Sequence, residues 1–222
     1  MSTSQHHTEP EPPLRRLSTP RAAALAGVVF AVLFGTTLIL IRLDMPDGIE
    51  GSIRWLNSQQ NAIKVATVLM PFAGISFLWF IGVVRDGLGR YEDRFFVSVF
   101  LGSGLLFLAM MFVGTAVAAG LVSSDTGATD PTARAQVVDF GKMVVVSVCQ
   151  TYALRMAAVF MISLATIWLK TGLMPRWLAG LSYLAAVALL VASETSRWMT
   201  LAFPAWVLVV SILILARSAS RT

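Results

Sequence analysis

Apolar residues occur in six long runs along the chain, and polar stretches separate one run from the next. The runs cover residues 22–41, 65–84, 95–121, most of 130–169, 177–193 and 199–216. An apolar run of about 20 residues is long enough to cross the hydrocarbon core of a bilayer as an α-helix. The pattern therefore predicts an all-α membrane protein, built as a bundle of six transmembrane helices.

The fourth run belongs to a segment, 130–169, that is about twice as long as a membrane-crossing helix needs to be. It starts with Asp130 and Pro131, which are residue types favoured at the cap and at the first position of a helix. We therefore expect one long fourth helix that extends outside the membrane, and that ends before Gly172.

The polar stretches divide the chain into three regions. Residues 1–20 are polar and rich in proline and predict a disordered tail, 21–217 form the membrane domain, and 218–222 form a second tail. Ser52 is expected to start an amphipathic helix that continues into the second run. The third run carries small residues four positions apart, with Gly102 and Gly114 among them, and this predicts a central, tightly packed helix.

Composition excludes a water-soluble domain. The chain is 56% hydrophobic and 13% charged, with a mean hydropathy of +0.75, whereas soluble domains carry about 25% charged residues. The formal net charge is +5, but the basic residues flank the apolar runs and are not interleaved with aromatic residues. We therefore expect the lipid bilayer as a partner, and no nucleic acid.

The distribution of the basic residues predicts the orientation. Ten lie in the two tails and in the second and fourth connections, and five lie in the other connections. Because Lys and Arg are enriched on the cytoplasmic side, both termini are expected in the cytoplasm, in the inner (cell) membrane of a bacterium. The ten are Arg15, Arg16, Arg21, Arg85, Arg90, Arg94, Lys170, Arg176, Arg217 and Arg221, and the five are Arg42, Arg54, Lys64, Arg134 and Arg197.

Arg155 is the one charged residue expected deep within a span, and a charge at membrane depth suggests a function by default. At about 100° per residue, a polar half-circle of the fourth helix contains Arg155, while Lys142 and Gln150 fall on its other side. Its members are Ser147, Thr151, Tyr152, Arg155, Ser163 and Thr166. We expect this stripe to face the protein interior. Two roles remain open for Arg155, namely binding an anionic group and structural pairing within the bundle.

Glu194 is the expected partner if Arg155 is paired. Trp168 and Trp177 should both lie at the cytoplasmic interface, where tryptophan is enriched. Counting along each helix at about 1.5 Å per residue places Arg155 and Glu194 in the same outer half of the membrane. The candidate binding residues are therefore Ser147, Thr151, Tyr152, Arg155 and Glu194.

The sequence lacks the residues for most membrane-embedded catalysis. Its two histidines, His6 and His7, lie in the N-terminal tail, and Cys149 is its single cysteine. The spans therefore have no haem ligand, no histidine base for a serine protease and no redox cysteine pair. We expect no metal and no cofactor, and an enzyme is the third choice of function, after the two given next. The expected function is that of an accessory subunit or a small lipid- or ligand-binding bundle, with a bound lipid or a membrane protein as partner; the alternative is a transporter of a small anionic solute that uses Arg155.

Several short stretches resemble a group of uncharacterised bacterial multi-spanning membrane proteins. They are 79–86 (WFIGVVRD), 92–96 (EDRFF), 152–156 (YALRM), 174–177 (MPRW) and 203–206 (FPAW). They are spread from the second span to the sixth, so the resemblance covers most of the membrane region. It implies a membrane fold and brings no activity with it.

The orientation can be tested by cysteine labelling in intact cells, after Cys149 has been replaced by Ala. A membrane-impermeant thiol reagent should label a cysteine placed at Thr126 and should leave one placed at Gly87 unlabelled, because only the first is expected outside the cell. The reverse pattern would contradict the predicted orientation.

Overall fold

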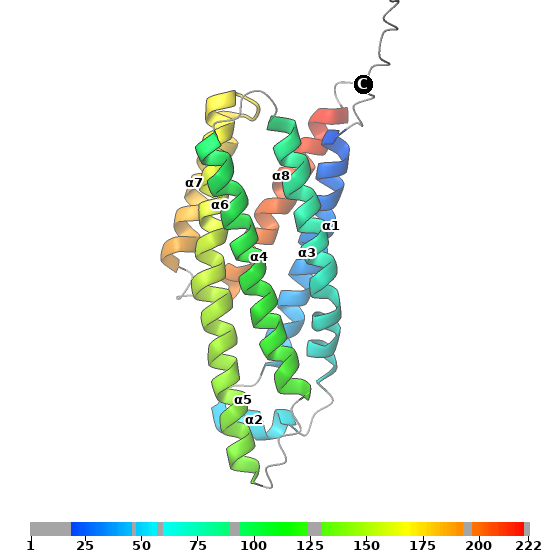
Figure 1. The fold of residues 1–222 in the computed structure, drawn as a ribbon, viewed down its shortest axis with the longest axis vertical. Coiled ribbons are helices and arrows are strands. Elements are labelled where there is room, and N and C mark those ends of the chain that lie inside the picture. Colours follow the sequence, from blue (N-terminus) through cyan, green and yellow to red (C-terminus); the bar gives the residue numbers. More distant parts are fainter. Residues whose placement is uncertain are drawn as a thin grey trace, which may run out of the picture.

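The computed structural model describes residues 19–45, 48–56, 60–88, 94–123, 130–192 and 197–219, and these residues form helices with no strand among them. In chain order the elements are α1 (Thr19–Asp44), α2 (Gly48–Leu56), α3 (Asn61–Leu88), α4 (Arg94–Ser123), α5 (Pro131–Val146), η2 (Ser147–Ala153), α6 (Leu154–Thr171), α7 (Arg176–Ala192), η3 (Arg197–Leu201) and α8 (Ala202–Ala219). Here η2 is a π-helical turn and η3 is a short 3₁₀ helix. The helices run side by side along one axis, and α2 lies across one end of the bundle, beside α5 (Figure 1).

Five helices in the described part are long and apolar enough to cross a membrane. They are Ala24–Asp44, Asn61–Asp86, Phe95–Ser123, Thr132–Thr171 and Trp198–Arg217. The fourth is a continuous run of 40 residues that comprises α5, η2 and α6. Helix α7 is also apolar but has only 17 residues. These lengths and compositions are typical of a multi-pass membrane protein.

The ends of the long fourth helix follow from its sequence. The Asp130 side chain accepts a hydrogen bond of 2.9 Å from the Thr132 backbone N–H, and Pro131 occupies the first helical position. Gly172 ends the helix in a left-handed conformation (φ 65°), and its N–H donates to the Trp168 carbonyl. Only glycine adopts that conformation without strain. Asp130 and Gly172 thus have the roles expected of them at the two ends.

The prediction of one helix that starts at Ser52 and continues into the second span is wrong at both ends. Helix α2 starts at Gly48 and ends at Leu56, and α3 starts separately at Asn61. Ser52 lies within α2, where its hydroxyl donates to the Gly48 carbonyl. Gln60 has a positive φ of 48° directly before α3, a conformation that no α-helix contains. Because of this break, α2 can lie across the bundle while α3 runs along it.

A cluster of phenylalanine rings holds five of the helices together. Phe30, Phe77, Phe107, Phe160 and Phe203 come from α1, α3, α4, α6 and α8, and all are fully buried. Phe77 is in ring contact with the other four, at centroid distances of 4.6 to 5.8 Å. Most of these pairs are tilted or edge-to-face, the arrangements that aromatic quadrupoles favour. The core is therefore centred on α3 rather than spread along one helix pair.

The fourth helix, and not α4, is the most buried element. In the most apolar stretch of Thr132–Thr171, 61% of the residues are buried, against 33% for Phe95–Ser123. Helix α6 packs against both α4 and α7. Gly102 and Gly120 on α4 are exposed, and no described atom beyond the backbone of α4 itself lies within 4 Å of the position that a Cβ would take there, whereas Gly114 is buried. Helix α4 also contacts α3, α5 and η2. The expected tight packing is confirmed at Gly104 and Gly114 and is not found at Gly102 or Gly120, because small residues at regular spacing do not say which of them meets a neighbour.

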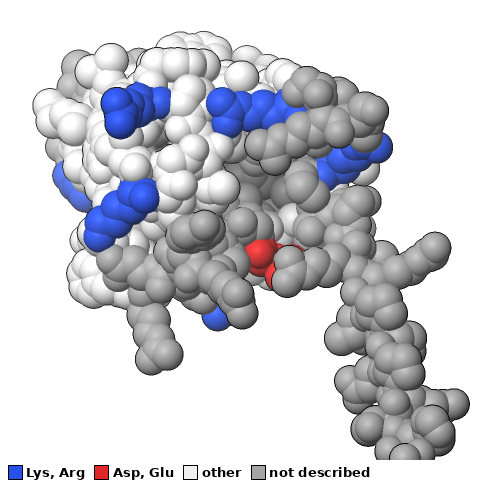
Figure 2. Space-filling view, turned by 90° about the horizontal axis from the view of Figure 1, so that it is seen from above, with Lys and Arg blue, Asp and Glu red and all other residues white. Residues whose placement is uncertain are grey.

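Basic side chains surround the end of the bundle opposite α2. Figure 2 shows Lys and Arg spread around this face. The described residues at this end include Arg21, Arg85, Lys170, Arg176 and Arg217, all exposed, together with Asp86. Lys170 lies over the Phe96 ring at 4.4 Å, and Arg217 donates to the Leu173 carbonyl at 2.8 Å. Among the described residues at this end, basic side chains therefore outnumber acidic ones.

Gly27 permits the closest contact of α1 with its neighbours and supplies a test of the packing. A Cβ atom there would overlap the Ser211 hydroxyl of α8 and would lie 2.8 Å from the Phe80 ring of α3. Gly27→Ala should lower the free energy of unfolding by about 1–3 kcal/mol through overpacking. Gly35→Ala, on the same helix, should have no such cost because nothing lies within 4 Å of its Cβ position. Thermal unfolding in one mild detergent measures both variants, and equal melting of the two would contradict the close packing at Gly27.

Candidate functional site

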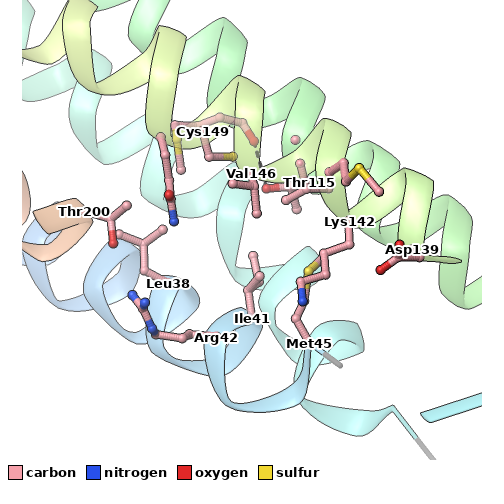
Figure 3. Close-up of a pocket in the computed structure, with 15 residues that line it drawn as sticks. Leu38, Ile41, Arg42, Met45, Thr115, Asp139, Lys142, Val146, Cys149 and Thr200 are labelled. Carbon is pink, nitrogen blue, oxygen red and sulfur yellow. Dashed lines mark hydrogen bonds between the residues drawn. The ribbon is translucent and has the colours of Figure 1, made fainter. Parts of the chain in front are cut away.

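A pocket of about 320 Å³ lies between α1, α4 and the α5–η2 part of the long helix, with η3 at its edge. We name it the α1–α5 pocket (Figure 3). It lies toward the end of the bundle where α2 is found, since it uses the last turns of α1 and the second half of α4. Its lining residues are Leu38, Ile41, Arg42 and Met45 of α1, Met111, Gly114 and Thr115 of α4, Asp139, Lys142, Met143, Val145 and Val146 of α5, Cys149 and Gln150 of η2, and Thr200 of η3.

Three charged side chains line this otherwise apolar pocket, and two of them are cations. Arg42 comes from α1, and Lys142 and Asp139 come from α5. In Figure 3, Lys142 reaches from α5 toward α1, while Arg42 turns along α1 toward Thr200. Among the lining residues, basic side chains therefore outnumber acidic ones by one.

Arg42 is held against an aromatic ring. Its guanidinium carbon lies 4.8 Å from the centre of the Trp198 ring, within the range of a cation–π interaction. Trp198 itself is 61% exposed and belongs to η3. Tryptophan and arginine together are common where a membrane helix leaves the hydrocarbon core. The stack therefore lies at the surface of the bundle.

The floor of the pocket depends on a glycine. Gly114 of α4 is buried, and a Cβ atom at this position would overlap the Cys149 sulfur of η2. No other described atom outside the helix of Gly114 would lie within 4 Å of that Cβ. Small residues allow membrane helices to approach this closely. Gly114 and Cys149 therefore bring α4 and η2 together directly beneath the charged residues.

The π-helical turn changes which face of the long helix is buried. Val145 and Met161 are both buried, although at about 100° per residue an ideal α-helix would place them about 160° apart. A π-helical turn contains more residues per turn than an α-helix. The seven residues of η2 absorb the difference, so that Val145, Cys149, Ala153 and Ala157 all pack inward at intervals of four. This change of phase turns Lys142 and Gln150 toward the pocket.

The uncharged polar groups differ in what they can offer a ligand. The Thr115 hydroxyl donates to the Met111 carbonyl at 2.8 Å, so its oxygen is left to accept hydrogen bonds. Gln150 carries both a donor and an acceptor, and Thr200 adds a further hydroxyl at the edge of the pocket. Donors from Arg42, Lys142 and Gln150 thus dominate the polar part of the lining.

The residues predicted as a binding site do not line this pocket. Arg155 is half-buried, and its Nη1 donates to the Thr151 carbonyl one turn earlier at 3.2 Å. Thr151 is also half-buried, but Ser147 is exposed and Tyr152 is 59% exposed. The expectation that the whole stripe faces inward is therefore not met, because it assumed one α-helical phase across η2. Glu194, the proposed partner of Arg155, lies outside the described residues.

The last two members of the polar stripe do face inward, beyond η2. Ser163 is buried and donates to the Val159 carbonyl at 2.8 Å. Thr166 donates to the Ile162 carbonyl and lies 2.7 Å from the Tyr183 hydroxyl of α7. These bonds stay within α6 or join α6 to α7, so they stabilise the packing of the two helices.

Arg42, Asp139 and Lys142 were not predicted as site residues. Arg42 was counted only as a charge flanking the first span, and Lys142 was assigned to the face away from the stripe. A usable signal was the pair Asp139 and Lys142, which are three positions apart on one helix and so share a face. Within the described residues, no group of three or more His, Cys, Asp or Glu side chains could hold a metal ion.

Comparisons with protein-family models, with curated proteins and with solved structures found no match to this chain.

The contact between Gly114 and Cys149 can be tested by a double-mutant cycle. Gly114→Ala should lower the free energy of unfolding by about 1–3 kcal/mol, because the new methyl group meets the Cys149 sulfur. In a Cys149→Ala background that cost should largely disappear, since the overlapping atom is gone. Thermal unfolding of the four proteins gives the coupling.

Gly120→Ala serves as the control on α4, because nothing lies within 4 Å of its Cβ position. It should melt like the parent protein. Equal costs of Gly114→Ala with and without the Cys149 sulfur would show that α4 and η2 do not meet there.

Proposed function

We propose that this protein is a non-catalytic membrane protein that binds a small amphipathic molecule in the α1–α5 pocket. The observation that carries the proposal is the pocket itself, with apolar walls and an excess of cationic side chains within an apolar helical bundle. Its volume of about 320 Å³ is at the lower end of the range for ligand sites. A ligand with an apolar part and a negatively charged or polar head fits this lining.

Catalysis is the weaker interpretation because the pocket does not assemble a nucleophile with a base. Cys149 is its one thiol, and the only histidines in the chain are His6 and His7. Asp139 precedes Cys149 on the same helix by a distance of about 15 Å along the axis. A nucleophile needs its base within hydrogen-bonding distance, so the lining supports binding better than reaction.

Transport through Arg155 is also less well supported. A carrier of this kind would need a cavity that reaches the arginine, and the lining of the α1–α5 pocket extends along the long helix only as far as Gln150. The half-buried Arg155 and its bond to the Thr151 carbonyl fit a structural role. An accessory-subunit role remains compatible with a ligand-binding pocket, since a bound lipid can join two membrane proteins.

We further propose that α7 completes six spans, with both termini in the cytoplasm of a bacterial cell and the bundle in its inner membrane. The 17 residues of α7 reach the lower limit for a transmembrane helix, and α7 packs against α6. The basic end opposite α2 (Figure 2) supports a cytoplasmic location of that end. Helix α2 and the first turns of α5 would then lie outside the hydrocarbon core, where the exposed Glu50 and Arg54 are solvated.

Native mass spectrometry of the protein in mild detergent tests the binding function. We expect a bound non-protein mass in the parent protein and its loss in Val146→Trp, because Val146 lines the pocket and a larger side chain fills it. Val137→Trp is the matched control, since Val137 is on the same helix, is 46% exposed and does not line the pocket. Absence of any bound mass, or a mass that survives Val146→Trp, would contradict the proposal.

A further inference from the structure

We infer that the ligand of the α1–α5 pocket is an anionic phospholipid whose phosphate is bound between Arg42 and Lys142. This inference rests on the binding function proposed above and adds the chemical class of the ligand. Its basis is the pairing of two cations from different helices with apolar walls that continue to the outside of the bundle.

The two cations suit a phosphate group in complementary ways. The guanidinium of Arg42 offers N–H donors in a planar fork that matches two phosphate oxygens, while the Lys142 ammonium acts as a compact point charge. They come from α1 and α5, so a phosphate between them would also link the first span to the long helix. Asp139 is the one acidic residue among the lining residues and lies on the same helix as Lys142.

Trp198 holds the Arg42 side chain in a suitable orientation. The ring lies 4.8 Å from the guanidinium carbon, and the N–H donors of a guanidinium lie in its own plane. A stacked guanidinium loses less freedom when it binds a second group. The 61% exposure of Trp198 puts this stack at the surface of the bundle, at the level where lipid headgroups lie.

The walls of the pocket favour a lipid over a soluble anion. Leu38, Ile41 and Met111 form an apolar interior, while Met143 and Val146 line the pocket and are also 57% and 38% exposed. The apolar lining is thus continuous with the outer surface of the bundle. A pocket of about 320 Å³ accommodates a headgroup and part of a chain, and the rest of the lipid can lie along the exposed apolar surface of the helices.

Lipid retention after reconstitution tests the inference. The protein is placed in vesicles of equal parts phosphatidylglycerol and phosphatidylcholine, extracted in mild detergent, and weighed intact with its retained lipid. We expect phosphatidylglycerol to be retained in preference. Arg42→Gln and Lys142→Gln should each lower that preference about fivefold, the usual contribution of one basic residue to anionic lipid binding. Asp139→Asn should raise it, because it removes the opposing charge.

Matched variants separate the site from the overall charge and from folding. Arg54→Gln removes one positive charge from α2, at the same end of the bundle but outside the pocket lining, and should leave the preference unchanged. Arg42→Lys and Lys142→Arg keep the charge and should largely keep the preference. Loss of preference in Arg54→Gln to the same degree as in Arg42→Gln would overturn the inference.

The outcomes distinguish this inference from the binding function itself. Equal retention of both lipids by the parent protein, with loss of both in Val146→Trp, would leave the binding site in place and refute the preference for an anionic lipid. Retention of neither lipid would refute both. Release of bound phosphatidylglycerol by millimolar glycerol phosphate would show that the site recognises a soluble phosphate ester, and would also overturn the inference.

Discussion

The contact that the rest of the structure depends on is the cluster of phenylalanine rings around Phe77. Between helices in a bilayer there is little hydrophobic driving force, because lipid tails are as apolar as the side chains they would replace. Association then depends on the shape of the contact and on direct attraction between side chains. Rings from α1, α3, α4, α6 and α8 meet around Phe77, so one buried group fixes the relative positions of five helices. The pocket can exist because these helices are already held together some distance from it.

Glycines near the cluster set the distances between helices. Gly27 lets α1 approach α8, and Gly114 lets α4 approach the π-helical turn. The second contact lies in the lining of the pocket, which α1, α4 and α5 form together with η2. The charged pocket is therefore a consequence of packing in the bundle and needs no additional domain. Some of its apolar lining residues, such as Met143 and Val146, are also exposed on the outer surface of the bundle.

Much of the fold could be predicted from the sequence, because apolar runs of sufficient length have few alternatives to membrane helices. The cap at Asp130 and the end at Gly172 were predictable for a similar reason, since each residue type has a specific local preference. The site was not predictable in the same way. Arg155 was favoured because it is the most conspicuous charge in an apolar run, and its polar stripe was drawn at one constant angle per residue. Nothing in the composition of Ser147–Ala153 indicates a π-helical turn, and that turn decides which polar residues meet.

The small-residue pairs of α4 illustrate a second limit. Spacing identifies which glycines share a face, but only the arrangement of neighbouring helices decides which glycine is used, and here it is Gly114 rather than Gly102. Contacts between residues far apart in the sequence, such as Arg42 with Trp198, have no local signature. These are the contacts on which a binding site between helices depends.

The π-helical turn makes the two halves of the long helix independent of each other in rotation. A helix of uniform pitch that buried Met161 in the core would carry Lys142 to a different side, away from α1. With the wider turn of η2 between them, α6 can pack in the core of the bundle while α5 presents its polar residues to the pocket. Substitutions among the pocket-lining residues of α5 therefore need not disturb the packing of α6, and the polar lining can diverge while the bundle stays the same.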